Sequence, residues 1–119
     1  MNDVETITGV IDLLKDPDHW VKGIRALTEN GVAIEPTSPK AVRFCLGGAV
    51  IRVVDDEEWN GWDWGNTVGV LFHQLAEERG FTVEHPFVEF NNHEDTTHED
   101  LMLFLKEALY RAEIEEVKS

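Results

Sequence analysis

The chain has 119 residues, of which 42% are apolar and 29% charged, a composition that suits one small globular domain. Its charge is less usual, because 24 Asp and Glu residues face ten Lys and Arg residues and leave a formal net charge of −14. Such a charge repels nucleic acids and anionic membrane surfaces, so direct binding to either is disfavoured and a basic protein partner is favoured.

The cysteine count and the apolar runs bear on the cellular compartment. Cys45 is the only cysteine, so no internal disulfide can form and a reducing cytoplasm is the expected location. The first residues lack a basic segment followed by an apolar run, and we expect no signal peptide. No apolar run approaches the roughly 20 residues that span a bilayer.

The first third of the chain predicts two helices. The first is expected over residues 4–15, where apolar residues recur at helical spacing: Val4, Ile7, Ile11 and Leu14. Asp16 followed by Pro17 is a favourable start for the second helix. Its apolar face would carry Trp20, Ile24 and Leu27, and Asn30-Gly31 would end it.

The most apolar segment of the chain, residues 40–54, allows two interpretations. Ser38 followed by Pro39 is a helix-start signal, and a helical stripe follows it: Val42, Cys45, Leu46, Ala49 and Val53. The β-branched run AVIRVV instead favours a buried strand. Because of the start signal we expect a helix, in which Gly47 and Gly48 would allow another helix to approach closely.

Residues 55–65, DDEEWNGWDWG, have the composition of a loop. Four consecutive acids precede three tryptophans, which are separated by Asn, Gly and Asp. The tryptophans either fill a gap between helices or form an exposed anchor ringed by carboxylates, and the sequence leaves both open. We expect Trp59 to turn inward, while Trp62 and Trp64 would share a face if the loop is extended.

The second half of the chain predicts two further helices. Asn66 or Thr67 would cap a helix that runs to Arg79 and ends at Gly80. Within this helix, His73 and Glu77 lie four residues apart and are expected to form a surface pair. Residues 81–90 alternate weakly and contain Pro86, so at most a short edge strand is expected there.

The last helix has the clearest signals of all. Its apolar stripe follows three- and four-residue spacing: Leu101, Phe104, Leu105, Ala108, Leu109 and Ala112. Either Thr96 with Glu99 or Thr97 with Asp100 would cap its start. The sequence thus predicts a mainly α fold: a single compact helical domain over residues 1–119, with about five helices and at most a short strand segment.

Three patches resemble a family of small uncharacterised proteins from bacteria and their phages, known only as a domain of unknown function. They are Trp20-Val-Lys-Gly23, the segment Ala41–Ala49 with its aromatic-Cys-x-x-Gly-Ala pattern, and Phe90-Asn-Asn92 followed by Thr97–Leu101. The resemblance spans roughly residues 12–112 and leaves out the loop 55–65. It implies a compact, mostly helical fold and favours Thr97 as the helix cap, and it carries no activity. Phe90 and Asn92 stand where the family usually has Trp and Asp.

Two sets of residues are candidates for sites of chemistry. Cys45 could serve as a nucleophile with a histidine and Asn91, but its apolar neighbours favour a small buried side chain. The His and acidic residues at 93–100 are the densest set of possible metal ligands: His93, Glu94, Asp95, His98, Glu99 and Asp100. Their spacing fixes no shared face, so we expect no metal site and no cofactor.

The leading hypothesis is therefore a non-catalytic, strongly acidic interaction protein, an inhibitor or nucleic-acid mimic that binds a basic site on a larger protein. Assembly of identical copies is compatible with it. The expected contact residues lie in one loop: Asp55, Asp56, Glu57, Glu58, Trp62, Asp63 and Trp64. The alternative is a small enzyme or ligand binder built around Cys45 and the joint Asn91–Asp100.

Overall fold

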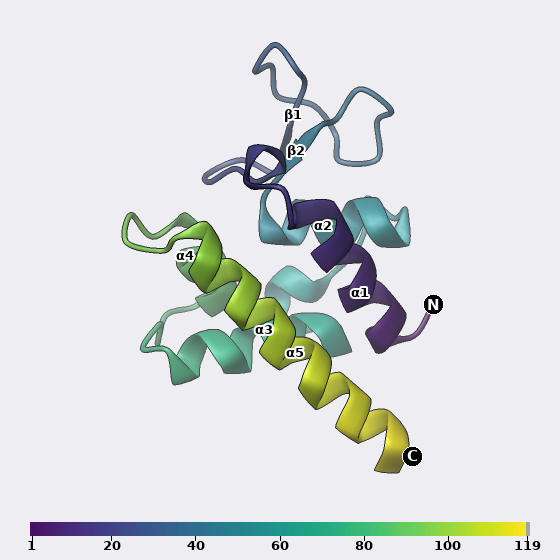
Figure 1. Cartoon of the computed structure of the whole chain (residues 1–119), viewed down its shortest axis with the longest axis vertical. Helices are drawn as coiled ribbons and strands as arrows, with labels where there is room; N and C mark the ends of the chain where they lie inside the picture. Colours follow the sequence, from purple (N-terminus) through teal and green to yellow (C-terminus); the bar gives the residue numbers. More distant parts are fainter. Residues whose placement is uncertain (119) are drawn as a thin grey trace.

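The computed structural model describes residues 1–118, and five α-helices make up most of that range (Figure 1). They are α1 (Asp3–Leu14), α2 (Leu46–Val54), α3 (Thr67–Glu78), α4 (Pro86–Asn92) and α5 (His98–Lys118). Two 3₁₀ turns, η1 (Pro17–His19) and η2 (Gly61–Asp63), and an antiparallel pair of strands, β1 (Ala26–Leu27) and β2 (Arg43–Phe44), complete the fold. The predicted mainly α class with a short strand segment is confirmed.

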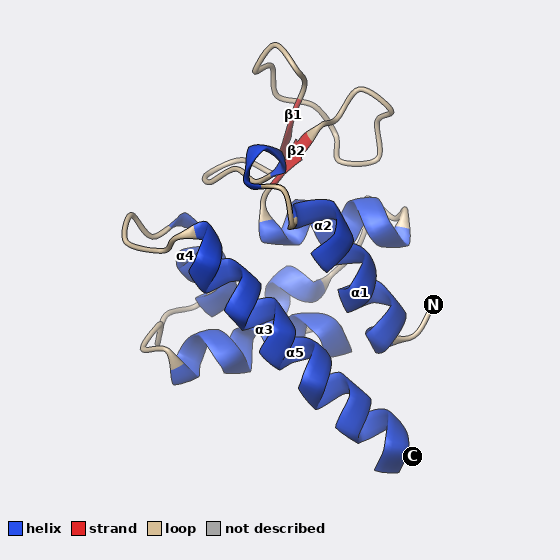
Figure 2. Ribbon diagram, viewed as in Figure 1, coloured by secondary structure: helices blue, strands red, loops and turns tan. Residues whose placement is uncertain are grey.

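The helices form one body, and the two strands with their long loops stand at one end of it (Figure 2). The long helix α5 crosses the front of the body diagonally, with α1 packed against it (Figure 1). Helix α1 also packs on α2, and α3 packs on α4. None of the helices within residues 1–118 combines the length and the apolar character needed to cross a membrane.

The predicted apolar stripe of α5 is confirmed as the centre of the core. Five of its residues are buried, and Leu109 packs against the core from its edge. Helix α1 supplies Ile7, Val10 and Leu14 to the same core, and the Phe104 ring stacks on Phe90 with centroids 4.4 Å apart. Burial of this apolar surface is the main force that holds α5 to the other helices.

Local capping signals predicted the starts of α3 and α5 correctly, and a third cap, at Asn2, was not foreseen. Thr97 Oγ1 accepts a hydrogen bond from Asp100 N (3.1 Å), and Asp100 Oδ2 accepts one from Thr97 N (3.0 Å), which is the second of the two predicted caps for α5. These bonds lower the pKa of Asp100. Asn66 Oδ1 caps α3, and Asn2 caps α1 through a capping box with Glu5.

The predicted helix after Asp16 is wrong. The Asp16 side chain does accept a hydrogen bond from Asp18 N (2.9 Å), but only the 3₁₀ turn η1 follows it. Gly23 has a left-handed φ of 82°, which interrupts any helix there, and β1 then pairs with β2. Long-range strand pairing thus overrides the helical spacing of this segment.

The helix expected from Ser38 begins only at Leu46. Ser38 Oγ accepts a hydrogen bond from Lys40 N (3.2 Å), so the start signal serves a local turn, and Arg43–Phe44 is a strand. A Cβ on Gly48 would lie 1.9 Å from the Arg25 carbonyl oxygen. The close neighbour that requires this glycine is therefore the backbone just before β1, not another helix.

Residues 81–90, where at most a short edge strand was expected, contain no strand, and the helix found there was not predicted. Residues 86–92 form α4, in which Pro86 occupies the first turn, a position where proline is favoured because no helical hydrogen bond needs its nitrogen. Phe87 and Phe90 turn toward the core on one side of this helix and are buried. The apolar residues that alternate weakly in the sequence therefore belong to one face of a short helix.

Candidate functional site

The four acids of the predicted contact loop lie at the C-terminal end of α2, where the negative end of the helix dipole adds to their charge. Asp55, Asp56 and Glu58 are exposed. Glu57 has a structural role, because its Oε2 accepts hydrogen bonds from Thr37 N (3.0 Å) and Thr37 Oγ1 (2.7 Å). Three carboxylates therefore face solvent, and the fourth ties the 28–42 loop to the body.

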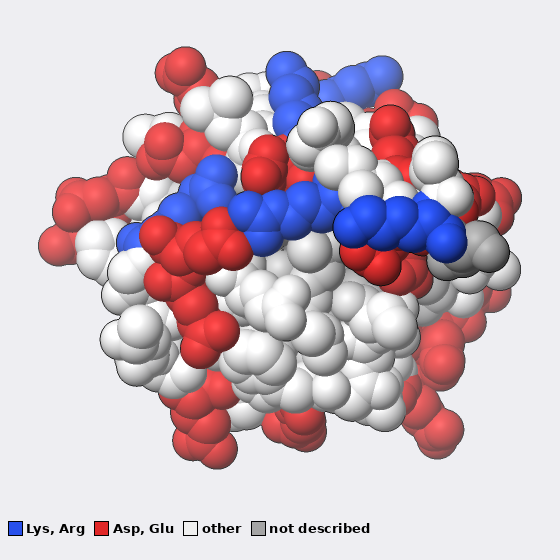
Figure 3. Space-filling model, turned by 90° about the horizontal axis from the view of Figure 1, so that it is seen from below, with Lys and Arg blue, Asp and Glu red and all other residues white. Residues whose placement is uncertain are grey.

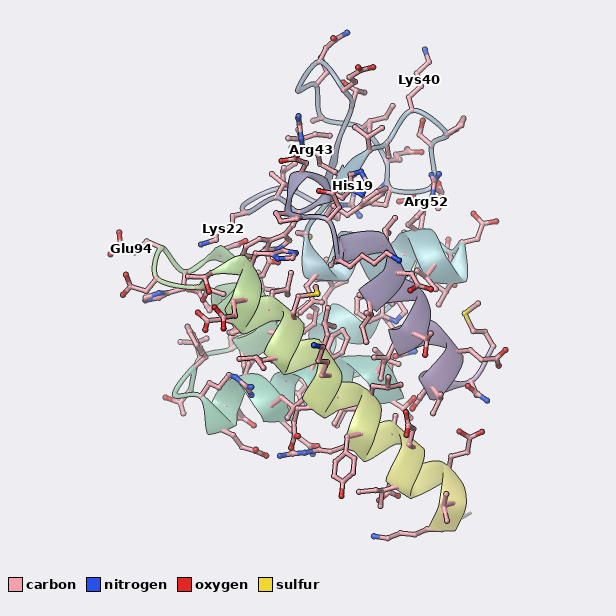
Figure 4. All side chains as sticks on the ribbon, in the orientation of Figure 1. His19, Lys22, Lys40, Arg43, Arg52 and Glu94 are labelled. Carbon is pink, nitrogen blue, oxygen red and sulfur yellow. The ribbon has the colours of Figure 1, made fainter. Side chains whose placement is uncertain are left out.

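Arg52 does not neutralise these carboxylates. Its guanidinium donates hydrogen bonds to the carbonyl oxygens of Pro36 and Ser38, toward the loop that carries Lys40 (Figure 4). The end of α2 therefore keeps a local excess of negative charge.

The tryptophans of this loop occupy three different environments. Trp59 is buried, as expected, and meets Trp62 edge to face with centroids 5.4 Å apart. Trp62 is half-buried: it stacks on Phe87 (5.6 Å), and a Cβ on Gly47 would lie 2.0 Å from its ring. Trp64 as a residue is 38% exposed, and its ring stacks on that of His73 with centroids 4.5 Å apart.

Trp62 and Trp64 do not share the exposed face that an extended loop would give them. The chain forms the turn η2 there, and Trp64 has a left-handed φ of 64°. Asp63, between them, is exposed, with Oδ1 4.0 Å from His85 Nδ1.

His73 is buried, which overturns the expected surface pair with Glu77. Its Nε2 lies 3.0 Å from the Gly61 oxygen and 3.1 Å from the Trp62 oxygen, while Phe87 N donates to its Nδ1 (3.3 Å). The acceptor role of Nδ1 makes Nε2 the donor, so the ring is neutral. Burial lowers the pKa of His73. The sequence signal that could have indicated the burial of His73 is its position next to Phe72, on the inner face of α3.

The three patches that carry the family resemblance meet at Asn91. Its Oδ1 accepts hydrogen bonds from Trp20 Nε1 (2.7 Å) and from Leu46 N at the start of α2 (3.0 Å). Its Nδ2 donates to Val21 O (3.3 Å) and to Asn92 Oδ1 (2.9 Å). One buried side chain thus joins the 20–23 segment, α2 and α4.

Neighbouring contacts extend this junction. Asn92 Oδ1 also accepts from Gly23 N (2.8 Å). Lys22 reaches the joint between α4 and α5 (Figure 4), where its Nζ donates to the carbonyl oxygens of His93 (2.6 Å) and Thr96 (2.7 Å). The roles of Trp20 and Lys22 were missed, because only the Trp-x-x-Gly pattern marked that segment.

A small cavity of about 130 Å³ lies beside the Asn91 junction. The residues that line it include Cys45, Gly47, Trp62, Phe87, Val88 and Asn91. The structure therefore brings Cys45 and Asn91 together, as the alternative hypothesis required. His93, Asp95 and Asp100 instead line a separate hollow with Arg79, so the joint after Asn92 does not belong to this cavity.

Cys45 caps α2, a position not foreseen from the sequence. Its Sγ accepts a hydrogen bond from Gly48 N (3.2 Å), and a helix N-terminus ordinarily favours a thiolate. Burial is the larger effect and raises the pKa of the Cys45 thiol. The expected burial of Cys45 is confirmed, and at neutral pH the group is a protonated thiol.

The acidic and histidine residues at 93–100 have local structural contacts. Asp95 N donates to His93 Nδ1 (3.1 Å), His98 Nε2 lies 2.7 Å from the Leu14 oxygen, and Asp100 caps α5. Among residues 1–118, no three His, Cys, Asp or Glu side chains gather closely enough to hold a metal ion.

Fold and site together define a small, mainly α-helical protein whose N-terminal segment, α2 and α4 are joined at one buried asparagine. A sequence model described as Family of unknown function (DUF6197) matches residues 1–111, so the chain belongs to this family. The match includes the loop 55–65, which the resemblance from the three patches had left out. No curated protein and no solved structure matches the chain.

Proposed function

We propose that this protein is a non-catalytic interaction protein that binds a basic site on a larger protein and so acts as an inhibitor. The observation that carries the proposal is the group of exposed carboxylates at the negative end of α2, in a chain of net charge −14. Asp55, Asp56, Glu58, Asp63 and Trp64 are the contact residues. A cytoplasmic setting and a bacterial or phage source belong to the same proposal, supported by the lone cysteine and by the family resemblance.

Inhibition at a basic protein site is a better description than full nucleic-acid mimicry. A duplex carries one negative charge per roughly 1.7 Å of its axis, which a mimic must approach along one face. Viewed from below (Figure 3), this protein shows acidic groups separated by uncharged surface and by a row of Lys and Arg. Three clustered carboxylates suit a local basic patch, where they accelerate association through electrostatic steering.

Affinity capture with the wild-type protein and a charge variant tests this proposal. The variant combines Asp55→Asn, Asp56→Asn and Glu58→Gln, and it leaves Glu57 in place because Glu57 holds the 28–42 loop. A basic protein retained by the wild type should associate about tenfold more slowly with the variant, with a smaller difference at high salt. Melting temperatures should agree, since the three carboxylates are exposed.

The matched control variant neutralises three exposed acids elsewhere: Glu29→Gln, Glu94→Gln and Asp95→Asn. It changes the net charge by the same amount as the loop variant. Equal slowing by both variants would show that total charge, not the loop, steers the partner. Undiminished association of both would contradict the proposed site outright.

The cavity at Cys45 and Asn91 supports a second candidate, a binder of a small neutral molecule. At about 130 Å³ it has room for a few heavy atoms, given roughly 30 Å³ for one liquid water. Because the Cys45 thiol is protonated, binding would be non-covalent. Fragments that occupy it should shift the NMR signals of Leu46 and Asn91 together; a fragment screen that leaves both signals unmoved would rule this candidate out.

A further inference from the structure

A groove of about 650 Å³ lies between α1, α3 and the second half of α5. Its floor is apolar and consists of Val4, Val70, Leu71, Ala112 and Ile114. Of these, Ala112 is buried, and the other four remain partly exposed along the groove. The residues that line it on α5 continue to Glu116, past the end of the family match at residue 111.

Hydrogen bonds between the helices fix the walls of the groove. Thr67 Oγ1 on α3 donates to Asp3 Oδ1 on α1 (2.8 Å), and Asn2 Nδ2 donates to Glu116 Oε1 on α5 (3.3 Å). Along the side, Arg111 makes a two-pronged ion pair with Glu78 at 2.7 and 2.6 Å. All three helices are therefore tied together around the apolar floor, which stays open to solvent.

The margins of the groove are negative. Asp3, Glu115 and Glu116 line it, and the single basic residue that lines it is Arg111. Arg111 is bound by two carboxylates, since its Nε also donates to Glu107 Oε1 (3.1 Å). Lys118 Nζ lies 3.8 Å from Glu115 Oε1, so five carboxylates stand beside two basic side chains and the margin keeps a net negative charge. Seen from below, Figure 3 shows uncharged surface with acidic groups around its lower border and a row of Lys and Arg along its upper side.

We propose that this groove docks an amphipathic helix of a basic partner protein, with its apolar face on the floor and its Lys and Arg residues against the acidic margins. The stretch of α3 that lines the groove runs from Thr67 to Gln74, about 10 Å at 1.5 Å per residue. Two turns of a helix with apolar residues at i, i+3 or i+4, and i+7 cover that length.

A second copy of this chain does not suit the groove. Each copy has a net charge of −14, and pairing two copies on this face would bring acidic margins together. The docking site rests on the proposed function in one respect, because both take the partner to be a basic protein. It adds a second contact surface, which shares no residue with the loop 55–65.

The test uses the full chain and a fluorescent amphipathic peptide of about 14 residues built from Leu and Lys. Binding is followed by fluorescence anisotropy, with a scrambled peptide of the same composition as the charge control. Leu71→Asp should weaken binding at least about tenfold although it adds a negative charge, because it removes apolar contact. The matched control Leu103→Asp changes an exposed leucine of α5 outside the groove and should stay within about twofold.

A second variant keeps the test decisive if Leu71→Asp fails to fold. Gln74 is exposed and lines the groove, so Gln74→Arg should keep the wild-type melting temperature. It should still lower the affinity for the peptide several-fold, because the new positive charge repels the lysines of the peptide. Equal binding of the scrambled peptide, no peptide binding, or equal losses for Leu71→Asp and Leu103→Asp would each overturn the groove as a docking site.

Two further arms separate this site from the proposed loop site and from self-association. The loop variant with Asp55→Asn, Asp56→Asn and Glu58→Gln should bind the peptide as the wild type does. If it alone loses the peptide, the loop site is supported and the groove is refuted. A dimer in light scattering that dissociates with Gln74→Arg would identify a second copy as the occupant and would also refute the proposal.

Discussion

Trp20 and Asn91 lie 71 positions apart in the sequence, yet the Trp20 indole N–H donates a 2.7 Å hydrogen bond to the Asn91 amide oxygen. That same oxygen accepts the Leu46 N–H, the first backbone donor of α2. The first N–H groups of a helix have no acceptor inside the helix, and Asn91, which lies on another helix, supplies an acceptor for one of them. The position of α2 therefore depends on α4, and both depend on the 20–23 segment.

Replacing Asn91 should disconnect these elements. Asn91→Ala leaves the buried Leu46 N–H and the Trp20 N–H without their acceptor, at about 1–3 kcal/mol for each unsatisfied group. We expect a loss of about 3 kcal/mol or more in the free energy of unfolding, measured by urea denaturation. Asn92→Ala is the matched comparison, because Asn92 is exposed, and should cost about 1 kcal/mol. Equal losses would show that Asn91 is not the organising residue.

Gly48→Ala tests the observed start of α2. A Cβ at this position would lie 1.9 Å from the Arg25 oxygen and 2.8 Å from its carbonyl carbon, and backbone atoms cannot swing away as a side chain can. We expect a loss of about 3 kcal/mol, at the upper end of overpacking costs. Gly9→Ala is the control, since the nearest atoms to its Cβ would belong to the side chain of Val53 (2.8 Å) and alanine favours the helix. If both substitutions are equally mild, Arg25 does not pack against α2 as described.

Local and long-range signals explain which parts of the fold the sequence could predict. The starts of α3 and α5 follow from Asn66 and Thr97, whose side chains cap the next few residues. The start of α2 does not, because it is set by Asn91 and by the bond from Cys45 N to Arg25 O (3.2 Å). Both partners of α2 are distant in sequence, so the nearer signal at Ser38 gave the wrong start.

The same distinction applies to the candidate sites. The composition of residues 55–58 predicted exposed acids, and three of the four are exposed. That Glu57 instead binds Thr37 depends on where the 28–42 loop folds back, which no local pattern encodes. The groove between α1, α3 and α5 is formed by residues from three helices and had no signature in any one segment.

The three tryptophans of the loop should differ in their effect on stability. Trp59→Ala removes a buried ring and should cost about 3–5 kcal/mol of unfolding free energy. Trp62→Ala uncovers Gly47 and Phe87, and because Trp62 is only half-buried we expect about 2 kcal/mol. Trp64→Ala loses mainly its stacking on His73, worth about 1 kcal/mol. Chemical denaturation of the isolated protein gives all three values.

The order of these losses bears on the proposed contact surface. Trp64 can serve a partner because its removal should leave the protein folded. If Trp62→Ala and Trp64→Ala each destabilise the protein as much as Trp59→Ala, the whole loop belongs to the core and the partner binds elsewhere.

Stability should fall as the pH drops below about 6.5, the ordinary pKa of histidine, because His73 is buried as a neutral ring. Its pKa is lowered in the folded protein, so below that pH the unfolded chain binds a proton that the native state does not, and the free energy of unfolding decreases. Protonation would also set an N–H at Nδ1 against the Phe87 N–H that now donates to it. The pKa values of Asp100 and Glu78 are lowered, so both stay ionised in this window.

Melting temperatures measured between about pH 8 and pH 5 test this dependence in three proteins. The wild type should lose stability below about pH 6.5, and His19→Gln should follow it, because His19 is exposed. His73→Gln should have a lower melting temperature at pH 8, since it loses the hydrogen bonds to Gly61, Trp62 and Phe87. Its melting temperature should change less than that of the wild type as the pH falls. If His73→Gln keeps the wild-type slope, another group causes the acid sensitivity, and the neutral His73 ring does not hold the 59–65 loop against α3 and α4.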